Sequence, residues 1–364
     1  MHKLFFFVCF VFLFTKSAES QISDSTIINL FEQQFSDSIA QINEKNEHLK
    51  ASRDAYNEGL LLLEKENYIE AINHFTNAII IDSIFSEAYL SRAKCYEGPN
   101  DELAIADYLK AFELDSSQLA PLYSVADLQF KSDKELAKQT YSLIISLNEA
   151  EYKALSQLGV IAFLAEDYQE AEQLFSQSLV INTNAYTLND RGSCYRKMEQ
   201  FDRAIQDYLA AIALNTDLAF VYSNLASVYA NQGEIEKALS YYDLAISKDV
   251  NYALAYNNKA SILLESKEYD KANSAINKAL VANPEYAPAY NNRGVIHHQL
   301  KKYKEAITAF DKAISLDANY AKAYLNRGIS KQMTRNEDGA CSDWNKAKEL
   351  GIMMVKKYLA NDCE

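Results

Sequence analysis

The chain contains few of the residues that interrupt helices. Among its 364 residues there are only 9 glycines and 4 prolines. Folds rich in β-strands need frequent turn residues, so this scarcity disfavours them and favours helices joined by short loops. Long apolar runs are scarce too. Beyond the first twenty residues, no run is long enough to span a bilayer, and we expect no membrane span.

Basic residues are in the minority, with 36 lysines and arginines against 50 aspartates and glutamates, a net charge of −14. A surface of this sign repels nucleic acid and anionic lipid, so we expect neither as a partner. The histidines are scattered, and the chain has no glycine-rich phosphate loop and no nucleophile motif. We therefore expect no catalytic residue, no cofactor and no metal.

The first twenty residues, MHKLFFFVCFVFLFTKSAES, differ from the rest. They have early basic residues, an apolar run from Leu4 to Phe14 and small residues before the Ser20–Gln21 bond. This order is typical of an export signal peptide cleaved after residue 20. A helical run of this length rises about 16 Å, well short of a bilayer core of roughly 30 Å, which disfavours a membrane anchor. We expect an exported protein in the periplasm, at the cell surface or secreted.

A small residue returns at intervals of 33 or 34 residues along almost the whole chain. Eleven or twelve residues after each one stands an alanine, and four residues beyond each alanine stands a large apolar residue. The small residues are Gly59, Ala93, Ala126, Gly159, Gly192, Ala226, Ala260, Gly294 and Gly328. The large apolar residues are Phe75, Tyr108, Tyr141, Phe175, Tyr208, Tyr242, Ile276, Phe310 and Trp344.

A period near 34 is typical of a stacked array, and apolar spacings of three or four residues within each unit indicate helices. The small residues and alanines let two helices approach closely, and neighbouring units must stack to bury their apolar faces. This order of residues resembles the tetratricopeptide repeat over residues 52–350, as nine repeats, of which the second and third are degenerate. The resemblance implies an all-α, right-handed superhelical solenoid of stacked antiparallel helix pairs.

Both flanks of the array are expected to be caps. In residues 21–51, apolar residues such as Phe31, Phe35 and Ile42 recur at helical spacing, which predicts an amphipathic helix that covers the first repeat or docks onto a partner. Residues 351–364 predict a final capping helix with a polar outer face, which a terminal unit needs for solubility.

The cysteines divide into two groups. Cys95 and Cys194 hold equivalent places three repeats apart, too far for a disulfide, and we interpret both as small buried apolar residues. Cys341 lies on the last repeat and Cys363 near the end of the final helix, which should fold back beside it. A disulfide between them is possible in an exported protein, and two free thiols are the alternative.

A polar residue, mostly asparagine, stands two positions before the small residue in many repeats. We name this set the polar stripe; its central members are Asn224, Asn258, Asn292 and Asn326. Possible further groove residues are Asn57, Asp190 and Lys322. The resemblance implies that first helices line a concave groove. There a carboxamide, with one acceptor and two donors, can pair with a peptide backbone. The alternative is that these asparagines only solvate the groove or bond to a neighbouring helix.

The resulting hypothesis is a non-catalytic scaffold or adaptor that binds an extended peptide or helix of a partner protein in its groove. The partner and the oligomeric state are open. One alternative is carbohydrate or small-ligand binding in the groove. Another is an accessory subunit of an envelope assembly or secretion complex. A fold of this kind serves many tasks, so the hypothesis rests partly on resemblance.

Overall fold

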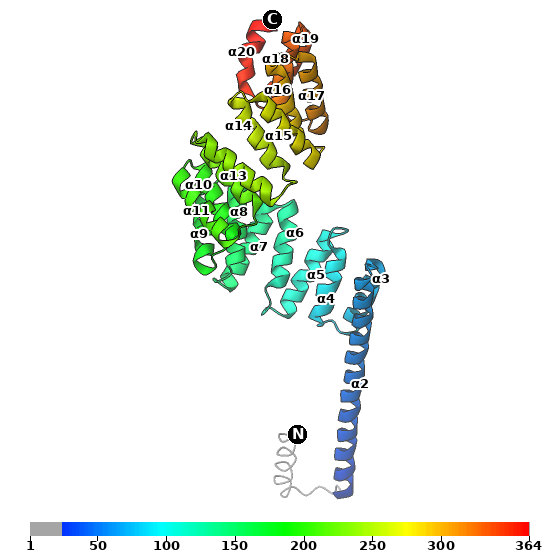
Figure 1. Ribbon diagram of the computed structural model, residues 1–364. Coiled ribbons are helices and arrows are strands. Elements are labelled where there is room, and N and C mark those ends of the chain that lie inside the picture. Colours follow the sequence, from blue (N-terminus) through cyan, green and yellow to red (C-terminus); the bar gives the residue numbers. More distant parts are fainter. Residues whose placement is uncertain (1–23, 364) are drawn as a thin grey trace. The chain divides into compact units, whose positions relative to one another are not determined.

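The computed structural model describes the backbone of residues 24–363, and all of its regular structure over that range is helical (Figure 1). In the N-terminal half the helices are α2 Asp24–Glu64, α3 Tyr68–Ile81, α4 Ser86–Tyr96, α5 Asp101–Leu114, α6 Ala120–Ser132, α7 Lys134–Leu147, α8 Tyr152–Leu164 and α9 Tyr168–Ile181. Then follow α10 Ala185–Lys197, α11 Phe201–Leu214, α12 Ala219–Asn231, α13 Ile235–Lys248, α14 Ala253–Glu265, α15 Tyr269–Ala282, α16 Ala287–Gln299, α17 Tyr303–Leu316, α18 Ala321–Met333, α19 Glu337–Glu349, the 3-10 turn η1 Met353–Val355 and α20 Lys356–Asp362.

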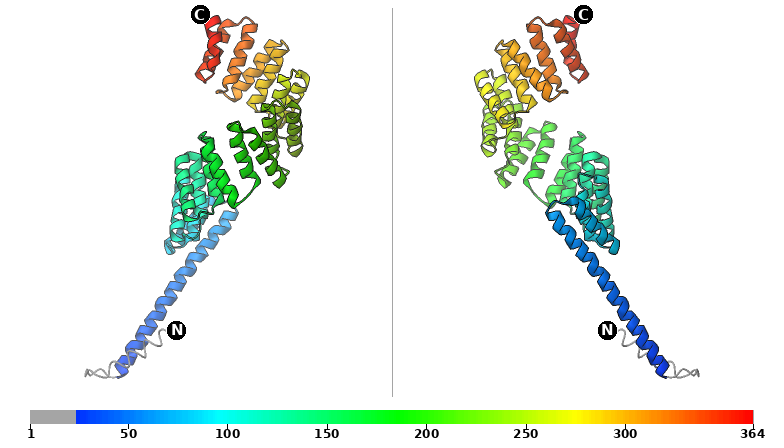
Figure 2. Two further views of the ribbon diagram at one scale, coloured as in Figure 1. Left: turned by 90° about the vertical axis from the view of Figure 1, so that its left-hand side faces the viewer. Right: turned by 90° about the vertical axis from the view of Figure 1, so that its right-hand side faces the viewer.

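The chain divides into two compact units, residues 1–140 and residues 141–364, which we call unit 1 and unit 2. Within unit 1, α2 packs on α3 and α4 packs on α5. Within unit 2, each even-numbered helix from α8 to α18 packs on the helix that follows it, and each pair contacts the next (Figure 2). The expected fold class, an all-α array of stacked antiparallel helix pairs, is confirmed.

The turn inside most pairs has a left-handed residue just after the first helix. In the turn after α16, Lys301 has φ 59°, and the N–H groups of Lys301 and Lys302 donate to the carbonyls of His298 and His297. This is the Schellman arrangement, which satisfies carbonyls at the end of the helix. The same left-handed position is held by Glu66, Glu166, Glu199, Gly233, Lys267 and Arg335.

The core of each pair is built on the small residue of the first helix. Gly294 faces the fully buried ring of Phe310, and a Cβ added at Gly294 would lie 2.5 Å from the Cε1 atom of that ring. Gly328 stands in the same relation to the buried ring of Trp344. Glycine is therefore required opposite these two rings, although Ala226 holds the same position in the pair that buries the Tyr242 ring. The alanines expected on the second helices are all buried too.

The N-terminal flank differs from the expected separate cap. Helix α2 runs without a break through residue 51, and Ser52, whose hydroxyl donates to the carbonyl of Ala78, is the first buried residue after the exposed stretch 29–51. Side chains of residues 29–51 are exposed, so this part of α2 does not cover the first helix pair. The only glycine in α2 is Gly59 and it has no proline, which explains why the helix continues.

The C-terminal flank closes the last pair of unit 2. Val355 is fully buried, and the ring of Tyr358 stacks on that of Trp344 with centroids 5.0 Å apart. The final helix is only seven residues long and follows a 3-10 turn. A disulfide joins Cys341 to Cys363, with Cα atoms 5.6 Å apart. Within residues 24–363, no helix has both the length and the apolar character needed to cross a membrane.

Candidate functional site

The polar stripe lies on the first helices of successive pairs. In unit 2 its members are on α10, α12, α14, α16 and α18, and all of them are partly buried: Asp190, Asn224, Asn258, Asn292 and Asn326. In unit 1, Asn57 is exposed on α2, and in unit 2 Lys322 is exposed at the start of α18. The structure thus places one polar residue per first helix along unit 2, as a row of side chains.

Members of the row bond to the preceding first helix. Asn224 Nδ2 donates to Asn189 Oδ1 at 2.8 Å, and Asn326 Nδ2 donates to Asn291 Oδ1 at 2.9 Å. Asn292 Nδ2 donates to both Asn257 Oδ1 at 2.9 Å and Ser261 Oγ at 3.0 Å. The carboxamides therefore tie one first helix to the next.

The asparagine acceptors in these bonds are the residues just before the stripe positions. They are almost fully buried, with exposed fractions of 7% for Asn189, 6% for Asn257 and 5% for Asn291. Buried carboxamides are costly unless they are bonded, so the stripe is partly architectural. This row of buried acceptors was not expected from the sequence. The doublets Asn257-Asn258 and Asn291-Asn292 are the signal that could have revealed it.

The chain of carboxamide bonds is interrupted between α12 and α14. On α12, Ser223 stands at the position where α10, α14 and α16 have an asparagine acceptor. No bond from Asn258 to Ser223 is present in the described part of unit 2. Asn258 instead lies near the hydroxyl of Tyr242, whose pKa burial raises and whose contacts with Ser227 and Asn258 partly offset that rise.

Asp190 takes the stripe position on α10 and accepts from Asn189 Nδ2 at 3.1 Å. Burial raises the pKa of its carboxyl group, and the hydrogen bond from Asn189 opposes that effect only in part. A charged group at this place is therefore less favourable than the neutral carboxamides of the later repeats.

A second set of polar contacts joins the helices within a pair. Arg191 on α10 makes two bonds of 2.8 Å to the carboxylate of Asp207 on α11. Arg327 likewise holds Asp343 and also reaches Asp311 on the preceding second helix. Each arginine lies 16 positions from its aspartate, on a different helix. They were not expected from the sequence, because the arginine and aspartate do not recur in every repeat.

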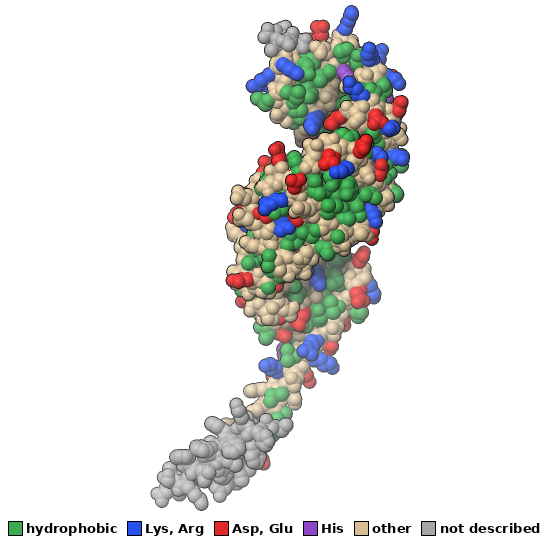
Figure 3. Space-filling view, turned by 60° about the vertical axis from the view of Figure 1, so that its left-hand side comes forward, with side chains coloured by type: hydrophobic (Ala, Val, Ile, Leu, Met, Phe, Trp, Pro, Cys, Tyr) green, Lys and Arg blue, Asp and Glu red, His purple; other side chains and the backbone are tan. Residues whose placement is uncertain are grey.

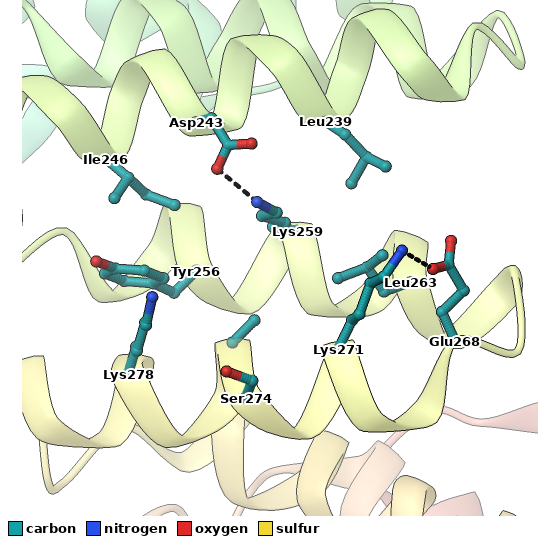
Figure 4. Close-up of a pocket in the computed structure, with 11 residues that line it drawn as sticks. Leu239, Asp243, Ile246, Tyr256, Lys259, Leu263, Glu268, Lys271, Ser274 and Lys278 are labelled. Atoms are coloured by element: carbon teal, nitrogen blue, oxygen red, sulfur yellow. Dashed lines mark hydrogen bonds and ion pairs between the residues drawn. The ribbon is translucent and has the colours of Figure 1, made fainter.

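A cavity of about 360 Å³ lies among α13, α14 and α15 (Figure 4). Its apolar lining includes Leu239, Ile246, Tyr256, Leu263 and Ala275. Its polar lining is Asp243, Lys259, Glu268, Lys271, Ser274 and Lys278. No residue of the polar stripe lines it, so the cavity and the stripe are separate surfaces of unit 2.

Residues capable of chemistry elsewhere are accounted for by packing. Burial lowers the pKa of His297 and of His298, and His298 Nδ1 bonds to Ser330 Oγ at 2.9 Å. Cys95 and Cys194 are buried free thiols, and burial raises the pKa of Cys194 to about 12. Within the residues that the structure describes, no cluster of three or more histidine, cysteine or acidic side chains is placed to hold a metal ion.

Comparison with known families gives matches in unit 2. Models described as tetratricopeptide repeat match residues 221–251, 253–286 and 287–320, and one described as TPR repeat matches residues 192–233. These ranges run from within α10 to just before α18.

Two curated relatives are similar over less than half of the chain. Tetratricopeptide repeat protein 6 of Homo sapiens is 29% identical over 160 residues, which are 43% of this chain and 31% of that protein. Anaphase-promoting complex subunit 6 of Arabidopsis thaliana is 27% identical over 169 residues, which are 44% of this chain and 31% of that protein. The chain thus spans about a third of the length of the curated relatives it matches.

Solved structures share the fold. A tetratricopeptide repeat protein from Parabacteroides merdae aligns with a TM-score of 0.55 and 18% identity, over 66% of this chain and 97% of that one. A chain of the APC/C hetero-tetramer Cut9-Hcn1 aligns with a TM-score of 0.58 and 14% identity, over 86% of this chain and 76% of that one. With the family matches, these similarities show that the chain contains tetratricopeptide repeats in residues 192–320, within an all-α array of helix pairs.

Proposed function

We propose that the chain is a non-catalytic scaffold that holds an extended segment of a partner protein along the first helices of unit 2. Similar proteins are named as a subunit of a multi-protein complex and as part of a hetero-tetramer, which supports a role in protein assembly. The observation that carries the proposal is a mainly apolar row of side chains beside the polar stripe.

This mainly apolar row lies four residues, about one helical turn, before the stripe on the same face of each first helix. Tyr186 is 59% exposed and Leu254 is 40% exposed. From α10 to α18 the row reads Tyr186, Phe220, Leu254, Pro288 and Lys322. An extended peptide presents side chains alternately to two sides, so its apolar side chains would pack on this row while its backbone faces the carboxamides.

The bonding of the stripe limits how it would hold a peptide. Both N–H groups of the Asn292 carboxamide are used within the array, so it has only acceptor capacity to offer. Asn224 and Asn326 each make a single bond among the described residues and retain one N–H group. Asn224 and Asn326 could therefore donate to a peptide backbone, whereas Asn292 could only accept from it.

The test compares substitutions on the two sides of unit 2. Leu254→Ser and Asn326→Ala are each expected to weaken partner binding at least tenfold, measured by surface plasmon resonance with the captured partner. Val281→Ser is the matched control, because Val281 is 83% exposed on the second helix α15. Melting temperatures of all variants must be checked, since Asn326→Ala leaves the buried Asn291 acceptor without its donor. Equal binding by all variants would contradict the proposal.

One observation favours a second candidate function, binding of a carbohydrate or a small planar ligand. The rings of Tyr186 and Phe220 stack with centroids 6.0 Å apart and an interplanar angle of 27°, on neighbouring first helices. An exposed aromatic platform of this kind can stack against a flat ligand. If this candidate is right, Tyr186→Ala abolishes glycan binding whereas Asn326→Ala leaves it unchanged.

We further propose that the protein is exported, to the periplasm or the cell surface, and that nine repeats fill residues 52–350. The proposed signal peptide, residues 1–20, lies outside the described residues. This location is a requirement for the alternative role, an accessory subunit of an envelope assembly or secretion complex. Intact mass of the protein from its native source tests the export step. A mature N-terminus at Gln21 is expected, and retention of the first twenty residues would contradict it.

A further inference from the structure

The arginine–aspartate ion pairs allow one helix pair to be compared with another. In three helix pairs an arginine on the first helix holds an aspartate carboxylate on the second helix: Arg92 with Asp107, Arg191 with Asp207, and Arg327 with Asp343. The aspartate side chains are at most 9% exposed. The spacing within each pair is 15 or 16 residues. Each buried carboxylate thus ties its second helix to the first helix of the same pair.

The pair α14/α15 lacks this carboxylate. Lys259 takes the position of the arginine. Ala275, 16 residues later, takes the position that Asp207 and Asp343 hold in their own helix pairs. Lys259 Nζ turns instead to Asp243 on the preceding second helix, whose side chain is 60% exposed (Figure 4). The cavity of about 360 Å³ lies where the aspartate is missing, and both Lys259 and Ala275 line it.

The cavity lining carries more positive than negative charge. Lys259 pairs with Asp243 and Lys271 pairs with Glu268. Lys278 makes no ion pair among the described residues and lies 6.0 Å from the ring centroid of Tyr256. An uncompensated cation beside an apolar wall contrasts with the net charge of −14 of the whole chain. The lining therefore complements an anion attached to an apolar group.

We infer that this cavity binds an acidic side chain of a partner protein, flanked by an apolar residue of the partner. The bound carboxylate would take the place of the missing aspartate, between Lys259 and Lys278, with the Ser274 hydroxyl donating to it. The flanking apolar side chain would pack on Leu239 and Leu263. This site uses none of the polar stripe, so it stands or falls independently of the groove proposed above.

The next pair, α16/α17, supplies matched controls. It also lacks the aspartate, with Arg293 facing Ala309, and Arg293 bonds to Asn277 Oδ1 at 2.9 Å. Lys312 is exposed at the place that corresponds to Lys278. Ala275→Asp would supply the missing carboxylate from within and fill the cavity. Ala309→Asp makes the same change 34 residues further on, away from it.

The experiment measures binding of a labelled peptide, Gly-Leu-Asp-Phe-Gly-Ser, by fluorescence anisotropy. The full chain should bind it saturably, and changing the peptide's aspartate to asparagine should weaken binding at least tenfold. Raising the salt concentration from 0.05 M to 0.5 M should weaken it several-fold, because the attraction is between charges. Equal binding of the asparagine peptide, or no saturable binding at all, would overturn the inference.

Protein variants locate the site. Ala275→Asp should abolish binding, while Ala309→Asp should leave it within twofold of the parent. Should Ala275→Asp fail to fold, Lys278→Gln on the exposed face is expected to weaken binding at least fivefold, with Lys312→Gln as its control. Equal effects of the two members of either pair would overturn the assignment. The small carboxylate 4-phenylbutyrate is a further probe. If it bound with a Kd as low as that of the peptide, the occupant would be a small carboxylate, and the assignment to a partner protein would be overturned.

Discussion

At the scale of single residues, the close contact between the two helices of a pair governs which small residue is allowed. Where the second helix presents Phe310 or Trp344, the first helix has glycine. Where it presents Ile276, the first helix has Ala260, and both are fully buried. The branched side chain leaves room for a methyl group that the Phe310 and Trp344 rings do not. Alanine also stands in the pairs that bury Tyr108 and Tyr242, so the choice depends on how closely each ring approaches.

Gly294→Ala is expected to lower the free energy of unfolding by about 1–3 kcal/mol, because the new methyl group overlaps the Phe310 ring. The double variant Gly294→Ala/Phe310→Ile recreates the Ala260/Ile276 combination of the preceding pair. It should be less destabilised than the sum of its two single variants, as measured by guanidinium denaturation. Additive effects would show that the two positions do not interact.

Asp190→Asn is expected to stabilise unit 2 near neutral pH. Burial raises the carboxyl pKa in the folded state, so the folded protein loses stability as pH rises through the ordinary pKa of about 4 toward the raised value. The neutral carboxamide avoids that loss. Its melting temperature should exceed that of the parent at pH 7 and match it at pH 3. A gain of equal size at both pH values would point to a cause other than charge.

The sequence predicted the apolar positions well because each contact there needs only the right size and spacing. It could not predict which atom Asn292 would bond, since a carboxamide suits a peptide and a neighbouring helix equally. In the structure, Asn292 Nδ2 donates to Asn257 and Ser261 on the preceding first helix. For this residue, the alternative of a bond to a neighbouring helix therefore holds. Whether the stripe also binds a peptide is still a prediction.

At the scale of helices and turns, a residue in the left-handed conformation follows the first helix of most pairs. Glycine adopts this conformation without the steric cost that Cβ imposes, yet only Gly233 uses it in unit 2, whereas Lys301 has φ 59°. The repeat alignment ignored these turn positions because their residue types vary.

Lys301→Gly is therefore expected to stabilise the protein by about 0.5–1 kcal/mol, and Gly233→Ala to destabilise it by a similar amount. Both positions lie in exposed turns, so packing changes little. Thermal denaturation of the two variants beside the parent checks this. A shift of the same sign for both would contradict the turn explanation.

The C-terminal cap depends on a covalent link as well as on packing. In the unreduced mature protein, iodoacetamide under denaturing conditions should label Cys95 and Cys194 only, and after reduction also Cys341 and Cys363. Cys341→Ser should speed hydrogen exchange in residues 353–359, because the link no longer restrains the cap when it opens. Labelling of all four cysteines without reduction would show that the disulfide does not form.

Element boundaries were less predictable than element types. The repeat period placed the start of the first repeat at residue 52, where burial does begin, but it gave no reason to expect that α2 starts at Asp24 and continues through that point. Similarly, the final segment was expected as one helix and has a 3-10 turn before α20. Periodicity reports which residues are buried, whereas helix ends depend on local caps.

At the scale of the whole molecule, different surfaces of unit 2 suit different tasks. Acidic and basic side chains are interspersed on the face that Figure 3 shows. The first-helix face of unit 2 offers carboxamides beside an apolar row, and the cavity among α13, α14 and α15 offers cations. A scaffold with two such surfaces would bind two segments at once.

The most direct test of the central claim is site-specific photo-crosslinking in the native cells. A benzoylphenylalanine residue would replace Leu254, on the first-helix face, or Val281, on a second helix and more exposed. The account predicts that one partner protein crosslinks in high yield at position 254 and at background level at position 281. Equal yields at both positions, or a partner that crosslinks only at 281, would contradict binding along the first helices of unit 2.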